Sequence, residues 1–169
     1  MASENDSGAQ HSFDRKTAIT RRQFVQTGIA AGAAAALAGQ VRAEETMLKP
    51  VRIGMVGVGS RGAYLLRTLL ELPGVEINAD CDLVPERAAN AQKIVQEKTG
   101  KTPEAYTKDE HDFENLVRRD DLDAVICATT WQWHTPVTVA AMRAGKYGGT
   151  EVPAALTLEE CWQLVHTFE

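Results

Sequence analysis

An α/β fold with a doubly wound parallel sheet is the architecture that the sequence predicts for residues 44–169. Short apolar runs alternate there with longer stretches of helical periodicity, which is typical of parallel strands joined by crossover helices. The first apolar run also leads directly into a glycine-rich turn and then a helical pattern. The whole chain of 169 residues has the length of about one domain.

Five strands are expected, because five segments are short and mainly apolar. The first ends at Gly57, and the second follows the turn formers Pro73 and Gly74. The third is only three residues long, and Gly148 and Gly149 weaken the fifth. The expected strands are residues 51–56, 75–81, 104–106, 123–128 and 146–152.

Helices are expected between the strands from their apolar periodicity and from the residues at their ends. Pro85 and Pro136 suit the first turn of a helix, and Gly145 suits a C-terminal cap. Thr157 followed by Glu160 forms a capping box for the last helix. The expected helices are residues 61–72, 85–98, 112–118 and 136–144, with a last helix that starts at Thr157.

The composition is that of an ordinary globular protein, with 44% hydrophobic and 24% charged residues. The net charge of −5 makes nucleic acids and anionic membrane surfaces poor partners, so no nucleic acid is expected to bind. Cys81, Cys127 and Cys161 are far apart, which predicts neither a disulfide framework nor a metal site. We expect Cys127 and Cys161 to occupy core or near-core positions.

Residues 1–43 have the features of a twin-arginine signal peptide. Arg21 and Arg22 precede an Ala- and Gly-rich apolar stretch over residues 28–38, which is shorter than the ~20 residues that span a bilayer. Residues 41–43 then supply a small-residue cleavage pattern. We expect the twin-arginine export machinery to carry the protein to the periplasm. The alternatives are an Ala-rich globular helix and a retained membrane anchor.

The glycine-rich turn predicts a dinucleotide site in a Rossmann-type domain over residues 44–169. Gly57 permits the tight turn, Gly59 lets the backbone approach a pyrophosphate, and Gly62 lets the helix pack on the strand. Asp82, at the end of the second strand, is placed to bind ribose hydroxyls and to repel a 2′-phosphate. NAD is therefore favoured over NADP. The alternative for Asp82 is a helix cap ahead of Pro85.

Further polar and aromatic residues follow two later strands, at the edge of the sheet where such folds bind ligands. Trp131, Trp133 and His134 could form a wall beside the nicotinamide, or they could pack against the domain's own core. Glu151 could face the cofactor or be a solvated loop residue. Arg61 could flank the pyrophosphate or adenine, or simply be exposed.

These motifs resemble the Gfo/Idh/MocA oxidoreductase superfamily. The resemblance rests on the glycine loop, the Cys81-Asp82 pair, and the segment from His134 and Pro136 to Gly145 and Lys146. That superfamily usually carries Glu-Lys-Pro after its fifth strand, with a catalytic Lys, whereas Val152 stands at that place here. The Trp-Gln-Trp-His segment at 131–134 and the Glu-Val-Pro-Ala-Ala segment at 151–155 are similar to those of glycoside hydrolase family 109.

The resemblance implies an NAD-dependent glycosidase that acts on N-acetylgalactosaminide-like sugars. In that family NAD oxidises the sugar C3 hydroxyl, elimination expels the aglycone, water adds, and the hydride returns to C3. The residues that would line the NAD site are Ser60, Arg61, Asp82, Trp131, Gln132, Trp133, His134, Glu151 and Val152.

The family's base and most of its sugar contacts come from a second α/β domain. The sequence ends within or just after a helix, so we expect a truncation before that substrate domain. The fragment is expected to bind NAD without turning over a glycoside. The sequence leaves a homo-oligomer open and does not give the oligomeric state. The alternatives are an NAD-dependent sugar or polyol dehydrogenase of the same superfamily, which the absent Lys disfavours, and a non-catalytic binding protein.

Overall fold

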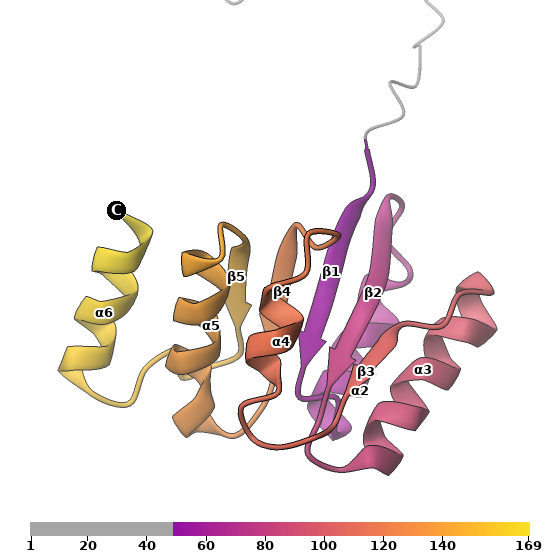
Figure 1. Ribbon diagram of the computed structural model, residues 1–169, viewed down its shortest axis with the longest axis horizontal. Coiled ribbons are helices and arrows are strands. Elements are labelled where there is room, and N and C mark those ends of the chain that lie inside the picture. Colours follow the sequence, from indigo (N-terminus) through magenta and orange to yellow (C-terminus); the bar gives the residue numbers. More distant parts are fainter. Residues whose placement is uncertain (1–48) are drawn as a thin grey trace, which may run out of the picture. The chain divides into compact units, whose positions relative to one another are not determined.

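A five-stranded, fully parallel sheet forms the centre of the fold, in the order β3-β2-β1-β4-β5 (Figure 1). The computed structural model describes residues 49–169. The twin-arginine signal expected over residues 1–43 therefore lies outside the described residues. The strands are β1 (Val51–Val56), β2 (Val75–Cys81), β3 (Glu104–Tyr106), β4 (Ala124–Cys127) and β5 (Tyr147–Thr150).

Helices cover both faces of this sheet, which confirms the doubly wound architecture. Leu66 of α2 and Val95 of α3 pack in one apolar cluster with residues of β1 and β2. Leu116 of α4 and Val137 of α5 pack in a second cluster with other residues of the same strands. The helices are α2 (Ser60–Leu69), α3 (Pro85–Thr99), α4 (Phe113–Val117), α5 (His134–Arg143) and α6 (Leu158–Phe168), with a 3₁₀ turn η2 (Trp131–Trp133) before α5.

The element boundaries differ from the sequence expectation at three places. Helix α5 begins at His134 rather than at Pro136, because the 3₁₀ turn at Trp131–Trp133 leads directly into it. Helix α2 ends at Leu69, three residues early, and Leu72 is left exposed. Strand β5 is four residues long and pairs with β4 alone among the described strands.

A register shift between β1 and β2 changes which side of the sheet the end of β2 faces. Ile53 pairs with Ile77 but Gly54 pairs with Ala79, so Asn78 is skipped. Ile77 therefore packs with α2 and α3, whereas Ala79 packs with α4 and α5. Asp80, the partner of Met55 in the register, consequently lies on the side of α2 and α3.

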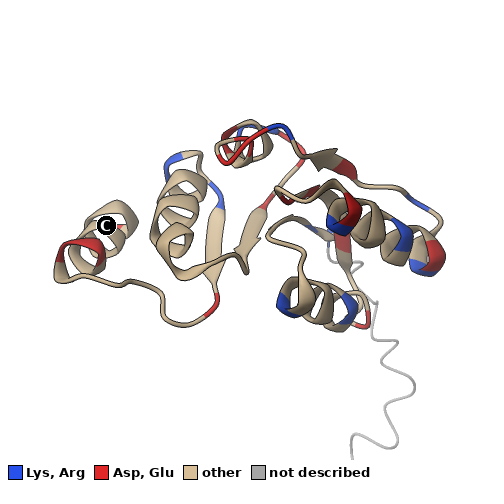
Figure 2. Ribbon diagram, turned by 90° about the horizontal axis from the view of Figure 1, so that it is seen from below, with Lys and Arg blue, Asp and Glu red and all other residues tan. Residues whose placement is uncertain are grey.

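Helix α6 has the capping box that the sequence predicts, with Thr157 and Glu160 each accepting from the other's backbone N–H. It contacts α5, but no residue of α6 is buried within the described part of the chain. Cys161 is consequently exposed, contrary to the near-core position expected for it. Figure 2 shows that the ribbons of α5 and α6 carry fewer charged residues than that of α3. Within residues 49–169, no helix has the length and apolar character to span a membrane.

Candidate functional site

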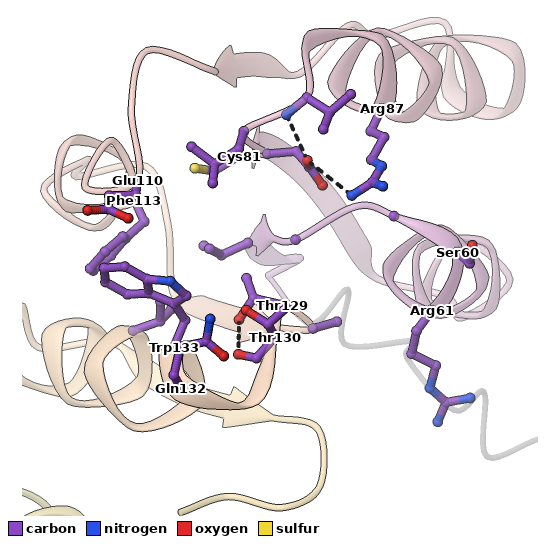
Figure 3. Close-up of a pocket in the computed structure, with 18 of the residues that line it drawn as sticks. Ser60, Arg61, Cys81, Arg87, Glu110, Phe113, Thr129, Thr130, Gln132 and Trp133 are labelled. Atoms are coloured by element: carbon purple, nitrogen blue, oxygen red, sulfur yellow. Dashed lines mark hydrogen bonds and ion pairs between the residues drawn. The ribbon is translucent and has the colours of Figure 1, made fainter.

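A pocket of about 510 Å³ lies at the carboxyl ends of the parallel strands (Figure 3). The glycine-rich turn after β1 forms one side of it, and the segment after β4 forms another. Strand order reverses between β2 and β4 on the two sides of β1, which is where doubly wound folds bind ligands. Seven of the expected site residues line this pocket: Gly57, Gly59, Ser60, Arg61, Asp82, Gln132 and Trp133.

The glycine-rich turn has the backbone geometry that its sequence predicts. Gly57 has a φ of +82°, which residues with a side chain rarely adopt, and its N–H donates to the Cys81 carbonyl at 2.7 Å. A Cβ atom on Gly62 would overlap the carbonyl oxygen of Gly57. Gly62 lies outside the pocket lining, and its lack of a side chain allows α2 to start directly against the end of β1.

The N-terminus of α2 is suited to bind an anion. Its cap residue, Gly59, offers no side-chain hydrogen bond, and the first turn of α2 contains no acidic residue. The first N–H groups of a helix have no partner within the helix and carry a partial positive charge. A Cβ on Gly59 would meet only the Arg87 side chain, at 3.6–3.8 Å, so the backbone at Gly59 is open to a ligand. These residues fit the phosphates of a dinucleotide.

Asp82 fastens the glycine-rich turn to the end of β2. One carboxylate oxygen accepts from the Val58 N–H at 2.9 Å, and the other accepts from the Val84 N–H at 3.0 Å. The second bond supports the alternative function of Asp82 at the start of α3, whose N-cap is Val84. Each carboxylate oxygen has a further lone pair, so Asp82 can also accept from a ligand hydroxyl.

Arg87 is a pocket residue that the sequence reasoning missed. Its Nη1 lies 3.8 Å from Oδ1 of Asp82, and its side chain is directed over Gly59. Its position in the first turn of the helix after β2 was a signal, because the carboxyl ends of parallel strands share one edge. Leu83, Asp109, Glu110, Phe113, Thr129 and Thr130 also line the pocket and were not expected there.

The two tryptophans after β4 occupy different positions relative to the pocket. Trp133 lines the pocket and packs edge-on against Phe113, with ring centroids 5.7 Å apart. Trp131 is 61% exposed and does not line the pocket, because a 3₁₀ turn directs the two rings differently. His134 is buried, and its Nδ1 donates to the Pro153 carbonyl at 2.8 Å. The structure thus places His134 beneath the site, in a packing position.

Glu151 and Val152 follow β5 and lie outside the pocket lining. Oε1 of Glu151 accepts from Nε and Nη2 of Arg61, at 3.0 and 2.8 Å. Val152 is 80% exposed and contributes nothing to the pocket within the described residues.

Cys81 also lines the pocket, but its thiol is unsuited to nucleophilic chemistry. Burial, followed by the nearby charge of Asp112, raises the pKa of Cys81 to about 12. The thiolate is the reactive form of cysteine, and the raised pKa of Cys81 disfavours that form at neutral pH. No cluster of three His, Cys, Asp or Glu suited to a metal ion occurs among residues 49–169.

Comparison with known proteins assigns the family. A model of the Gfo/Idh/MocA oxidoreductase family, with an NAD-binding Rossmann fold, matches residues 51–169. The chain belongs to the Gfo/Idh/MocA family. This Gfo/Idh/MocA chain has a β3-β2-β1-β4-β5 parallel sheet, as expected of a Rossmann-like domain.

Curated relatives of this Gfo/Idh/MocA chain include glycosyl hydrolase family 109 proteins. One from Saccharopolyspora erythraea is 40% identical over 92% of this chain, and one from Solibacter usitatus is 41% identical over 89%. The matches cover 38% and 36% of those relatives, so the chain spans little more than a third of their length.

Solved structures with this fold include dehydrogenases of the same kind of architecture. A myo-inositol dehydrogenase from Lactobacillus casei, in complex with NAD(H) and myo-inositol, is 28% identical with a TM-score of 0.59. The match covers 70% of this chain and 33% of that one. A scyllo-inositol dehydrogenase from the same organism has a TM-score of 0.61 at 24% identity, which shows the shared fold alone.

Proposed function

We propose that this chain is the NAD-binding part of an exported enzyme that cleaves N-acetylgalactosaminide-like glycosides. The observation that carries the proposal is the pocket of about 510 Å³ against the uncapped N-terminus of α2. The similarity to family 109 proteins over nine-tenths of the chain supports the glycosidase class.

The chain's own residues would hold the cofactor and exclude water from it. The first turn of α2, with Ser60 and Arg61, would bind the phosphates. Asp82 would hold the turn and accept from ribose hydroxyls, while Trp133 and Phe113 would form an apolar wall. When bound, NAD would supply reversible hydride transfer to and from the sugar, so that the cofactor would undergo no net redox change.

NAD is favoured over NADP by the carboxylates that line the pocket. Asp82, Asp109 and Glu110 all do so, and each would repel a 2′-phosphate. Arg87 opposes this effect, but its guanidinium already lies 3.8 Å from Asp82. The balance of charge at this end of the pocket therefore disfavours a further phosphate.

Isothermal titration of the purified chain tests cofactor binding. We expect NAD to bind about tenfold more tightly than NADP, and Asp82→Ala to weaken NAD binding about tenfold through the loss of charge-assisted hydrogen bonds. Asp120→Ala, which removes an exposed carboxylate that is not part of the pocket lining, is the matched control. Equal NAD affinities of the wild type and Asp82→Ala would show that Asp82 does not contribute to cofactor binding.

A second experiment distinguishes a glycosidase from a dehydrogenase. The dehydrogenase is the alternative function, and the similarity to an inositol dehydrogenase supports it. The longest product of the gene is incubated with NAD and either p-nitrophenyl N-acetyl-α-galactosaminide or myo-inositol. We expect nitrophenol to be released without accumulation of NADH. Net NADH formation from the polyol would favour the dehydrogenase instead. Residues 1–169 alone are expected to bind NAD and to release no nitrophenol.

Export by the twin-arginine route is a separate proposal that rests on residues 1–43. We expect this segment, fused to a folded reporter, to deliver the reporter to the periplasm and to be cleaved. Changing Arg21→Lys and Arg22→Lys together should leave the reporter in the cytoplasm. An uncleaved reporter in the membrane fraction would support the retained anchor.

A further inference from the structure

An ion pair joins the loops that follow β1 and β5. Arg61, in the first turn of α2, donates from Nε and Nη2 to the same carboxylate oxygen of Glu151. The two residues are 90 positions apart in the chain, and β4 lies between their strands in the sheet. The pair therefore crosses the carboxyl end of β4, beside the segment that lines the pocket.

This pairing neutralises a cation that an anionic ligand would need. Within the described residues, Arg61 and Arg87 are the two cations that line the pocket. Arg87 lies near Asp82, and Arg61 is held by Glu151. The centroid of the Tyr64 ring, one turn further along α2, lies 5.4 Å from Cζ of Arg61, within the range of a cation–π contact. A phosphate group must therefore compete with Glu151 for Arg61.

A ligand that takes Arg61 away leaves the Glu151 carboxylate without a partner. The Glu151 side chain is only 22% exposed, so water replaces the lost hydrogen bonds incompletely. Hydroxyl groups of a ligand can donate hydrogen bonds to the Glu151 carboxylate and replace those that Arg61 donated. The exchange is favourable only for a ligand that carries both an anion and hydroxyl donors near Glu151.

We propose that the Arg61–Glu151 pair selects dinucleotides over adenosine mononucleotides. Asp82 follows β2 and Glu151 follows β5, three strand spacings or about 14 Å apart across the sheet. A single ribose cannot serve both carboxylates, whereas a dinucleotide has a second ribose. ADP takes Arg61 and leaves Glu151 unpaired, while NAD satisfies both residues. This inference rests on the proposed dinucleotide site.

The test measures ADP and NAD dissociation constants of the full chain by titration calorimetry. Glu151→Gln removes the competing charge and should tighten ADP binding about three- to fivefold, the value of a partly exposed ion pair. The same change should weaken NAD binding, because the amide is a poorer acceptor for ribose hydroxyls. The ratio of ADP to NAD dissociation constants should therefore fall.

A double-mutant cycle separates this effect from a general change in charge. Arg61→Gln should weaken both ligands, and Glu151→Gln should no longer tighten ADP in the Arg61→Gln background. Glu76→Gln is the matched control, because Glu76 pairs with Lys101 at 3.0 Å outside the pocket lining. It changes the net charge equally and should leave both dissociation constants unchanged. Thermal unfolding of each variant verifies that the fold is intact.

The outcomes distinguish this inference from the proposed function. If the wild type binds both ligands but Glu151→Gln fails to tighten ADP, the selection by this pair is wrong and the cofactor site stands. If Glu76→Gln tightens ADP as much as Glu151→Gln does, a general charge effect explains the result and the inference is also wrong. If the wild type binds neither ligand, the proposed site itself is wrong, and the inference with it.

Discussion

Asp80 is a carboxylate inside the apolar core, on the side of the sheet that α2 and α3 cover. Asp80 is 1% exposed, and neither of its carboxylate oxygens has a hydrogen-bond partner among residues 49–169. Burial, followed by the charge of Asp82, raises the pKa of Asp80 to about 7. The neutral acid is therefore the form that the folded protein accommodates best.

We expect Asp80 to make the free energy of unfolding decrease as pH rises. Below about pH 4 the carboxyl is protonated in both states, whereas between pH 4 and 7 only the folded state keeps its proton. Stability therefore falls across that window. Asp80→Val should remove this dependence and stabilise the protein at pH 8 by at most about 4 kcal/mol. Urea unfolding at pH 5 and pH 8 measures both effects.

The control for this prediction is Asp120→Asn, which changes an exposed carboxylate. It should leave the difference in stability between pH 5 and pH 8 as it is in the wild type. Parallel stability profiles for wild type and Asp80→Val would show that Asp80 does not carry the pH dependence.

The three cysteines should differ sharply in their reactivity. Cys81 and Cys127 are buried, and burial raises the pKa of both thiols, whereas Cys161 is exposed on α6. We expect one fast-reacting thiol per native chain with Ellman's reagent, and three in denaturant. Cys161→Ser should abolish the fast phase. A fast phase that survives this substitution would contradict the buried positions of the other two.

At the scale of elements, the junction of β1 and α2 depends on close contact at Gly62. A Cβ at Gly62 would overlap the Gly57 carbonyl, and the backbone cannot move without disturbing the turn. We expect Gly62→Ala to destabilise the fold by about 2 kcal/mol or more, as overpacking does. Chemical denaturation measures the change.

The matched control for this prediction is Gly100→Asn at the C-cap of α3. Gly100 has a φ of +75° and open space around it, and Asn tolerates that conformation. It should cost well under 1 kcal/mol, since αL is accessible to Asn. An equal loss for the two variants would contradict a specific steric effect at Gly62.

At the scale of the whole molecule, several exposed apolar side chains occur in the last quarter of the sequence, from Tyr147 to Phe168. Trp162 and Phe168 are 54% and 83% exposed, and Tyr147 and Val152 lie nearby in sequence with exposures above three-quarters. Exposed apolar area can be buried by association with a second copy of the chain. The homo-oligomer that the sequence leaves open is a proposal, and this region is where we test it.

We expect the purified chain to self-associate with increasing concentration through this region. Replacing Trp162→Gln and Phe168→Gln together should lower the apparent mass in light scattering, because less apolar area is available to bury. Glu159→Gln, an exposed change on the same helix, should not. A mass that is independent of concentration in the wild type would contradict the prediction.

Local sequence patterns specify the alternation of strands and helices, the glycine-rich turn and the cap of α6. These features depend on neighbours within a few residues, where apolar spacing and backbone conformation act directly. The sequence also indicated Asp82 as a site residue, since it follows a strand at a known edge.

Which of these side chains come into contact depends on the packing of the whole domain. It placed Arg87 and Phe113 in the pocket, buried His134 beneath it, and left Trp131 and Val152 exposed. It also brought Arg61 to Glu151 across 90 residues. Such contacts depend on strand order and on the precise direction of each side chain, which no local pattern specifies. The local motifs therefore indicate a dinucleotide site, and the packing of the domain determines which residues line it.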